Sequence, residues 1–499
     1  MVTMNHRFIS SLIKESPAFP IVALFSDSKK DHLFVRGFDE QDQKYVAAVF
    51  KDFKAGWLEV DEISLPSHPK SRVILFGLGD KKKWTHRKLY LAARKITQYC
   101  KGSKKKNFSI LLDDFKVDRA TLEQCAEWFC RESELAHYDF NLYREKPKNG
   151  WPAVEEIRYY SKLSSGGSAL QKALDRGTII GEQVNRCRDL SNIPGGDMTP
   201  KLLAGAAQED GKKYGFDVNV LGEQEMKKLN MGALLGVSQG SSEEAQLIIM
   251  EYKEGAKTKK PLVFVGKGIP FDTGGLNLKP SSSLDEMHMD MSGGAAVVGA
   301  LGAIARLKLR VNVIGIVPAV ENMPSGSSYR PGDILRSMSG KTIEVSNTDA
   351  EGRVVLADAL TYAERYQPSL VVDLATLTGA SMVALARYAN ALFSYDEALI
   401  GRMRASGEES GDYLWPLPLW EEYEDELKSK VADFSNANKT RNAGATNGAL
   451  FLSKFASKFS SWAHIDIAPT MTTSPDMLLA AGSRGAGTAL LIELARKGS

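Results

Sequence analysis

The chain has 499 residues, of which 43% are hydrophobic and 25% are charged. This mixture is typical of a globular protein and excludes a disordered, collagenous or low-complexity chain. Single hydrophobic cores stop growing at ~250–300 residues, so we expect two or three domains. The net charge of +3 hides an uneven distribution, because the first 150 residues carry 27 basic and 20 acidic side chains and the remainder carries 37 and 41.

The four cysteines are scattered and form no CxxC or Cys/His cluster. Their spacing indicates reduced structural thiols rather than a disulfide framework or a zinc site. The longest weakly polar run, residues 293–305, is shorter than the ~18–20 residues of a membrane-spanning helix. The apolar segment 21–25 is too short for a secretory signal. We therefore expect a cytoplasmic protein with no membrane contact.

Residues 1–160 alternate short apolar runs with amphipathic segments, which predicts an N-terminal α/β domain. The predicted strands are 21–26, 72–79 and 108–115, and the predicted helices are 43–53 and 87–100. A helical pattern from about residue 169 to 190 predicts a linker helix within 161–190, which ends where Gly and Pro follow.

Residues 191–499 show a more regular alternation of strands and helices. The predicted strands are 216–221, 246–252, 261–266, 310–320, 342–347 and 369–375, and the predicted helices are 295–307 and 352–366. Several of these strands are apolar on both faces, as in sheets that helices cover on both sides. We expect a larger α/β/α domain with a mostly parallel or mixed central sheet.

Polar residues that could act in catalysis or bind a metal lie just after two predicted strands. Segment 265–290 offers Lys267, Asp272, Lys279 and Asp290, and segment 346–353 offers the remaining three, Asp349, Glu351 and Arg353. Ligands of open α/β sheets bind beyond the carboxyl ends of strands, so both segments are placed to meet at one site.

Each of these residues also has a purely structural interpretation. Thr348 and Glu351 have capping-box spacing, and so do Ser283 and Glu286. Asp349 could favour a helix dipole, whereas Arg353 in a first helical turn would oppose it. Lys267 and Lys279 could be solvated loop residues, and His288 is better explained as a packing or surface residue than as a metal ligand. No phosphate-binding GxxxxGK[ST] string is present.

Four carboxylates in one pocket could not all stay ionised without compensating cations. Two divalent metals ~3.5–4 Å apart would compensate them. Carboxylate ligands suit Mg, Mn and Zn. One lysine could ligate a metal that helps to remove its proton, and a second could stabilise an oxyanion. The residues alone thus predict metal-activated hydrolysis of an unspecified bond.

The string NTDAEGR (347–353) resembles the signature of the leucyl aminopeptidase (cytosol aminopeptidase) family. The similarity extends over most of residues 180–495, whereas the first 160 residues match only weakly. The further matching strings are GALLGVSQGS (232–241), VGKG…FD.GG…KP…DEM…D (265–290), ENMPSGSSYRPGDIL (321–335), DLATLTGA (373–380) and WAHIDIA (462–468).

The resemblance implies a role for each candidate residue. Asp272 and Glu351 match metal-bridging ligands, Asp349 matches a ligand of the more exchangeable metal, and Lys267 and Asp290 match ligands of the tighter site. Lys279 matches the lysine that polarises the scissile carbonyl. Arg353 matches the arginine that holds a bicarbonate ion, which acts as general base toward the metal-bridging water.

The resemblance further implies an active peptidase, a homohexamer in the cytoplasm, that removes N-terminal residues from peptides by attack of a metal-bridging hydroxide. Two divalent ions per subunit, Mn or Zn, are expected. The positions that match the apolar substrate pocket are Met287, Thr376, Gly379, Ala468 and Met471, and Leu377 would add a backbone carbonyl. Core packing is the alternative for these residues, whereas a Met-lined pocket favours Leu and other apolar residues.

Three features depart from the family pattern. Pro270 and Thr273 replace residues usual in the first motif, although Thr273 keeps the hydroxyl group. Pro469 stands where Gly is common, and segment 436–451 follows the family only loosely.

Two other functions compete with this prediction. The basic runs 81–88 and 101–106 could bind DNA, as some bacterial relatives do, although short lysine runs are usually solvated. A two-metal peptidase specific for cysteinylglycine or for acidic N-termini is the other alternative.

Overall fold

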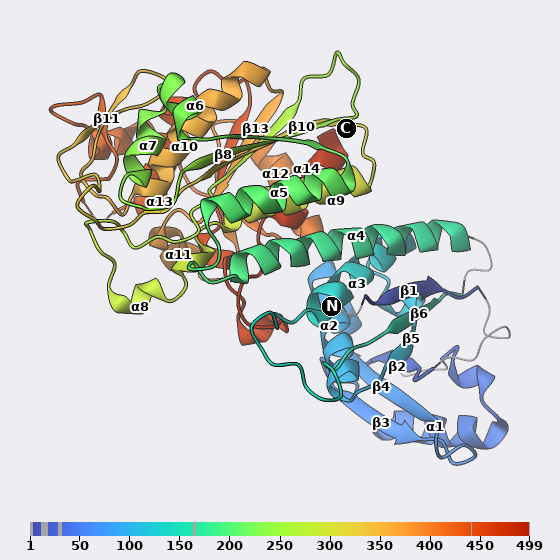
Figure 1. The fold of residues 1–499 in the computed structure, drawn as a ribbon. Coiled ribbons are helices and arrows are strands. Elements are labelled where there is room, and N and C mark those ends of the chain that lie inside the picture. Colours follow the sequence, from blue (N-terminus) through green and yellow to red (C-terminus); the bar gives the residue numbers. More distant parts are fainter. Residues whose placement is uncertain (1–2, 11–17, 28–31, 163–165, 441, 499) are drawn as a thin grey trace. The chain divides into compact units, whose positions relative to one another are not determined.

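The computed structural model describes every residue except 1–2, 11–17, 28–31, 163–165, 441 and 499. The chain divides into two compact units, Met1–Glu182 with Ser474–Ala480 and Gln183–Thr473 with Ala481–Ser499. The first division falls inside one long helix, α4 (Gly167–Asn192), which covers the segment predicted as a linker helix (Figure 1). Each unit has its own hydrophobic core.

The N-terminal unit contains two three-stranded sheets, in the orders β1-β6-β5 and β2-β4-β3. Its strands are β1 (Asn5–Phe8), β2 (Ile21–Phe25), β3 (Val60–Ser64), β4 (Arg72–Gly79), β5 (Asn107–Leu111) and β6 (Glu156–Tyr160). Its helices before α4 are α1 (Glu40–Asp52), α2 (His86–Gly102) and α3 (Leu122–His137).

The predictions for this unit succeed where apolar runs are continuous. The strands expected at 21–26 and 72–79 are confirmed. The strand expected at 108–115 ends at Leu111, because Leu112–Phe115 turn into a 3₁₀ helix. Strands β1, β3 and β6 were not predicted, because charged and polar residues interrupt their apolar pattern.

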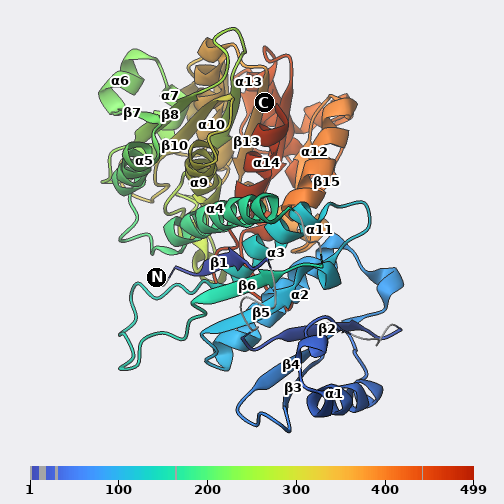
Figure 2. The same cartoon turned by 90° about the vertical axis from the view of Figure 1, so that its right-hand side faces the viewer.

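The C-terminal unit is built on an eight-stranded sheet in the order β15-β14-β17-β13-β9-β10-β8-β7. Figure 2 labels β7, β8, β10, β13 and β15 of this sheet. Its strands are β7 (Asp217–Leu221), β8 (Gln246–Lys253), β9 (Leu262–Gly266), β10 (Asn312–Ala319), β13 (Leu370–Ala375), β14 (Asn390–Phe393), β15 (Leu414–Pro416) and β17 (Trp462–Asp466). The central strands β17, β13, β9 and β10 are all parallel to their neighbours within this group. Strand β8 runs antiparallel to β10 and β7, and β14 runs antiparallel to β17 but parallel to β15. The expected mixed sheet is confirmed.

Helices cover both faces of this sheet, as the two-faced apolar strands predict. Helix α9 packs on one face with α5 and α14, and α10 packs on the other with α7 and α13. The helices of the unit are α5 (Pro200–Tyr214), α6 (Glu223–Lys228), α7 (Gly232–Ser238), α8 (Ser281–Leu284), α9 (Ser292–Arg306), α10 (Glu351–Ala363), α11 (Gly379–Leu385), α12 (Glu397–Ser410), α13 (Gly444–Ala456) and α14 (Thr488–Gly498). Among the described helices, no stretch has the length and apolarity to cross a bilayer.

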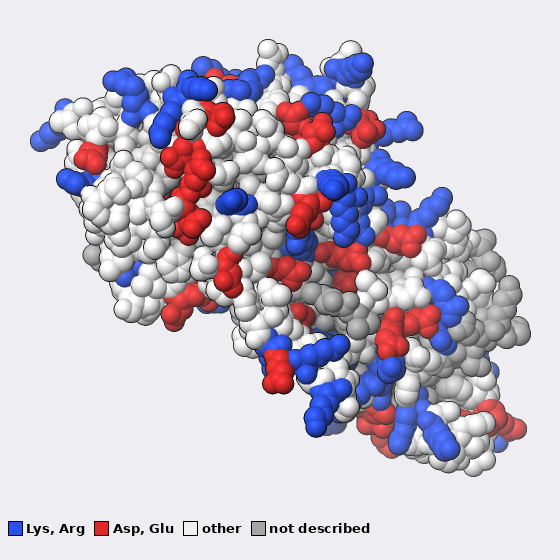
Figure 3. All heavy atoms as spheres, in the orientation of Figure 1, with Lys and Arg blue, Asp and Glu red and all other residues white. Residues whose placement is uncertain are grey.

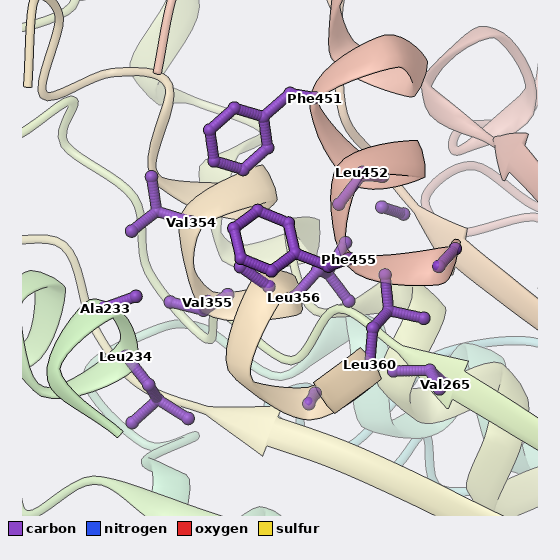
Figure 4. Packing of buried hydrophobic residues seen from close by; sticks show 14 of the residues in the cluster. Ala233, Leu234, Val265, Val354, Val355, Leu356, Leu360, Phe451, Leu452 and Phe455 are labelled. Atoms are coloured by element: carbon purple, nitrogen blue, oxygen red, sulfur yellow. The ribbon is translucent and has the colours of Figure 1, made fainter. Parts of the chain in front are cut away.

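Helix α10 forms the centre of the larger core. All its residues are buried, including Val354, Val355 and Leu360, and they pack between α7 and α13 (Figure 4). A helix that is buried around its whole circumference belongs to the core of a protein. The first residue of this helix, Glu351, is therefore buried as well.

One predicted strand belongs to a different sheet. The segment expected as strand 342–347 forms only β12 (Thr342–Glu344), which pairs with β11 (Ile334–Arg336) and β16 (Phe434–Ser435) in a small separate sheet. The strand ends at Glu344 because the following backbone bonds to Asp333 and to the side chain of Asn436 instead. The candidate segment 347–353 thus does not follow a strand of the large sheet.

The charge on the surface is mixed. On the face drawn in Figure 3, Lys and Arg side chains alternate with Asp and Glu over both units. The predicted basic run Lys81–Lys83 is an exposed 3₁₀ turn that Asp80 caps.

Close backbone packing fixes the start of α9 against the end of β9. A Cβ atom added at Gly266 would lie 2.3 Å from the carbonyl oxygen of Gly293. Real Cβ atoms do not approach backbone this closely, so the sheet and the helix require glycine here.

We therefore expect Gly266→Ala to destabilise the protein by about 1–3 kcal/mol, because the new methyl group must push α9 away from the sheet. The matched control is Gly401→Ala within α12, where no atom beyond the adjacent residues and the backbone of the helix itself lies within 4 Å of the added Cβ. That change should stabilise the helix by ~0.5–1 kcal/mol. Calorimetric unfolding measures both, and equal shifts would contradict the packing argument.

Candidate active site

Polar loops meet at one edge of the large sheet, where its parallel central strands end. Lys267 follows β9, Asn322 lies just beyond β10, Thr376 follows β13 and Ala468 lies just beyond β17. The turn before α10 reaches the same place from the small sheet, since Thr348 donates a hydrogen bond to the carbonyl of Gly274 at 2.6 Å. The two predicted segments therefore meet, although by a different route from the one expected.

Buried carboxylates and lysines form the centre of this region. Oxygen atoms of Asp272, Asp290 and Glu351 lie within 4.8 Å of one another, and all three residues are buried. Lys267 Nζ lies 2.7 Å from both Asp290 Oδ2 and Glu351 Oε1. Lys279 Nζ lies 2.8 Å from Asp272 Oδ2 and 2.5 Å from Asp349 Oδ1. We call these six residues the carboxylate–lysine cluster.

Burial and like charge disturb the protonation of the cluster. Burial, followed by the charge of Asp272, raises the pKa of Glu351 to about 8. Burial likewise raises the pKa of Asp290 to about 6. Burial opposes charge on Lys267 and Lys279, but the surrounding carboxylates outweigh it and raise the pKa of both lysines. Four carboxylates facing two ammonium groups leave the cluster short of positive charge.

The residues of the cluster suit divalent metal ions. The buried Oε2 atom of Glu351 receives no hydrogen bond from any described residue. Carboxylate oxygens are ligands that Mg, Mn and Zn accept, and a bound cation would supply the missing positive charge. The cluster therefore fits metal ions chemically, as the sequence predicted.

Gly352 allows Lys267 to lie close to the start of α10, which carries Glu351. A Cβ atom added there would lie 2.7 Å from Nζ and from Cε of Lys267. Gly274 has a positive φ of 87°, and a Cβ atom there would lie 2.9 Å from Asp349 Oδ1. Side chains at these positions would collide with the charged groups, so the motif requires glycine at both.

A hollow of about 630 Å³ opens beside the cluster. Its wall includes all six residues predicted for the substrate pocket, namely Met287, Thr376, Leu377, Gly379, Ala468 and Met471. Thr378 and Met382 also line it and were missed. Met382 could have been found from helical spacing, because it lies three residues after Gly379 in α11.

Arg353 is buried in the first turn of α10 and does not line this hollow. Its Nη1 donates a hydrogen bond to the carbonyl of Asn436 at 3.1 Å, and its buried Nε has no partner among the described residues. Burial lowers the pKa of Arg353 to about 10. The guanidinium group thus retains capacity for an anion.

The capping interpretations of the sequence are wrong. Ala350 is the N-cap of α10 and makes no side-chain cap, while Thr348 bonds instead to the loop that carries Asp272. Pro280 is the N-cap of α8, and no side chain caps that helix. His288 is partly buried in a 3₁₀ turn and lies outside the metal-ligand groups found among the described residues.

The fold and the site define an α/β protein with a buried carboxylate–lysine centre for divalent metals. The profile of the "Cytosol aminopeptidase family, catalytic domain" matches residues 185–492, and that of the family's N-terminal domain matches residues 21–147. The chain belongs to the cytosol aminopeptidase family and is a metallo-aminopeptidase.

Individual relatives agree with this assignment. A probable cytosol aminopeptidase of Azoarcus sp. is 40% identical over 96% of this chain and 92% of its own. A protein of the same name from Paraburkholderia phytofirmans is 43% identical over 80% of this chain and 78% of its own. The solved bottromycin maturation enzyme BotP in complex with Mn superposes with a TM-score of 0.84 at 30% identity, over 96% of this chain and 99% of its own.

The unbalanced charge of the cluster predicts a pH-dependent stability for the metal-free protein. The raised pKa of Glu351 means that its ionisation costs folding free energy as pH rises from 4.5 to about 8. Glu351→Gln should therefore raise the unfolding temperature of the metal-free protein at pH 8.5 by about 2–4 °C, which is ~1 kcal/mol in a large domain. The gain should shrink toward pH 5.

The exposed Glu397→Gln in α12 serves as the control and should give no such pH-dependent gain. Unfolding temperatures measured in chelator across this pH range decide the matter. A Glu351→Gln variant that is less stable than wild type at pH 8.5 would refute the charge argument.

Proposed function

We propose that this enzyme removes N-terminal residues, preferably Leu and other apolar residues, from peptides with the help of two divalent ions. The observation that carries the proposal is the contact between a buried carboxylate–lysine cluster and a hollow lined by methionines. The cluster suits metal ions, and the hollow suits an apolar side chain beside them.

Five residues would hold the metals. Asp272 and Glu351 would bridge them, Asp349 would complete one site, and Lys267 with Asp290 would complete the other. When bound, the ions supply Lewis acidity and a water that is nucleophilic at neutral pH. Lys267 can be a ligand only as a neutral amine, so its raised pKa in the metal-free protein means that metal binding must release its proton.

Lys279 is placed to act on the peptide carbonyl. Its ammonium group is held by Asp272 and Asp349, and it lines the hollow. The surrounding carboxylates keep it charged, so it can donate a hydrogen bond to a carbonyl oxygen that becomes negative during attack. Lys279 would thus stabilise the oxyanion.

Arg353 would hold a bicarbonate ion, and this ion would supply a general base for the water. Its buried Nε without a hydrogen-bond partner supports an anion at this place. The guanidinium group offers paired N–H donors that match a planar carboxylate-like anion.

The hollow itself favours apolar residues. Met287, Met382 and Met471 contribute flexible thioethers that adapt to aliphatic side chains of different shape. Asp285 and Glu286 also line it, and they would repel an acidic substrate residue. These charges favour Leu over Glu at the peptide N-terminus.

We extend the family resemblance to the assembly and the metal: a cytoplasmic hexamer that uses Mn or Zn. The Mn complex of the relative BotP supports the choice of Mn. Sedimentation analysis tests the assembly, and a mass corresponding to a monomer at micromolar concentration would exclude the hexamer.

The two roles within the cluster predict different losses. Asp272→Ala should abolish both metal binding and activity, because a bridging ligand serves both ions. Lys279→Ala should keep metal but lower kcat by about 10²–10³-fold, the usual loss for one oxyanion donor. Metal content and kcat of the purified variants separate the roles, and wild-type turnover by Lys279→Ala would contradict the second.

The lining of the hollow predicts the substrate order. A panel of aminoacyl-p-nitroanilides should show Leu and Met ahead of Ala, and Glu last. The acidic pair predicts that Glu286→Gln raises kcat/KM for the Glu substrate while leaving the Leu substrate almost unchanged. Faster hydrolysis of Glu than of Leu by the wild type would reverse the assignment.

A further inference from the structure

Asn322, in the loop after β10, lies inside the site but has no assigned role. It belongs to the string ENMPSG and is fully buried. Its single side-chain nitrogen donates to two acceptors, Asp272 Oδ1 at 2.8 Å and the carbonyl of Thr348 at 3.0 Å. Both N–H groups of one amide are thus used, and each bonds to a different loop that carries a carboxylate of the cluster.

Backbone hydrogen bonds also fix Asn322 beside Asp272. Asn322 and Asp272 form a β-bridge, in which the Asn322 N–H donates to Phe271 and the Thr273 N–H donates to Asn322. The Thr273 hydroxyl also donates to the carbonyl of Asn322 at 2.7 Å. The side chain therefore starts from a fixed point beside the carboxylate that it orients.

The two oxygens of Asp272 have different surroundings as a result. Oδ1 accepts from the backbone N–H of Gly274 and from Asn322, each at 2.8 Å. Oδ2 faces Lys279 at 2.8 Å, toward the interior of the cluster. The two hydrogen bonds occupy Oδ1 and leave Oδ2 to face the charged groups of the cluster.

The amide can serve these contacts in only one orientation. Its Oδ1 atom has no hydrogen-bond partner among the described residues and lies 2.8 Å from the position that a Cβ atom added at Gly275 would take. The reversed amide would direct its oxygen at a carboxylate and a carbonyl, which repel it. The unsatisfied oxygen is therefore the cost of the two donated bonds.

Thr348 is the second residue to which the Asn322 amide donates. Its carbonyl accepts from Asn322 and also from the hydroxyl of Tyr329 at 2.6 Å. Thr348 directly precedes Asp349 and lies three residues before Glu351. Asn322 thus links the loop of Asp272 to the turn that carries the other carboxylates.

We propose that Asn322 is a positioning residue that holds Asp272 and the 348–351 turn in one fixed arrangement and thereby sets the affinity for divalent metal. The proposal rests on the proposed function, because it takes Asp272 and Glu351 as ligands. Groups that orient ligands in this way typically contribute about 10–100-fold to metal affinity or activity.

The test is titration of the metal-free full-length protein with MnCl₂, in which free Mn²⁺ is followed by its magnetic resonance signal. Asn322→Ser removes both amide N–H donors while keeping a small polar side chain, and it should weaken Mn²⁺ binding about 10–100-fold. Asn322→Ala should do the same. Tyr329→Phe removes one donor to the same carbonyl without touching Asp272, and it should change affinity by less than about 3-fold.

Stability of the metal-free variants separates positioning from general loosening. The proposal expects the Asn322→Ser and Tyr329→Phe proteins to unfold at similar temperatures in chelator but to differ in Mn²⁺ affinity. An Asn322→Ser affinity within 3-fold of wild type overturns the proposal, and so does an equal loss in Tyr329→Phe. Failure of the proposed function looks different: a wild-type protein that binds Mn²⁺ but does not hydrolyse Leu-p-nitroanilide.

Discussion

Like charges confined in a buried space are the constraint on which the larger unit depends. Asp272, Asp290, Asp349 and Glu351 lie around only two ammonium groups, so the cluster carries more negative than positive charge. Such a group cannot be assembled by local chain preference, because each carboxylate disfavours the next. The backbone must therefore force the charges together, and the apolar core supplies the free energy that makes this possible.

The eight-stranded sheet brings the charged residues together, because several of its strands end at the same edge. Helix α10 then brings Glu351 to that edge, because its own apolar residues lock it between α7 and α13. Hydrogen bonds from Thr348 and Asn322 join the loops that carry the carboxylates. Rigidity in the core is thereby transmitted to atoms that must hold a narrow geometry.

Much of this arrangement could be predicted from the sequence because it depends on residue type. Continuous apolar runs predicted the buried strands β9, β10 and β13, and the charged residues between them predicted the cluster. The family resemblance predicted the pocket residues, all of which line one hollow. Their roles in catalysis stay predictions.

Other features depend on partners far apart in the chain and carry no local signal. The contact of Asn322 with Asp272 spans 50 residues and involves an ordinary asparagine. The position of 342–344 in a small separate sheet depends on Phe434 and Ser435, about ninety residues later. The capping-box spacing of Thr348 and Glu351 was misleading, because the hydroxyl group bonds to a distant loop instead.

The charge imbalance of the cluster links the lifetime of the protein to the supply of metal. A ligand that binds only the folded state stabilises it by about 2.7 kcal/mol when present at 100 times its dissociation constant. Without metal, the same chain carries the repulsion of its carboxylates and opens more often, which exposes it to proteolysis. Cells short of metal would then hold fewer copies of this enzyme, because the metal-free protein is degraded and does not accumulate.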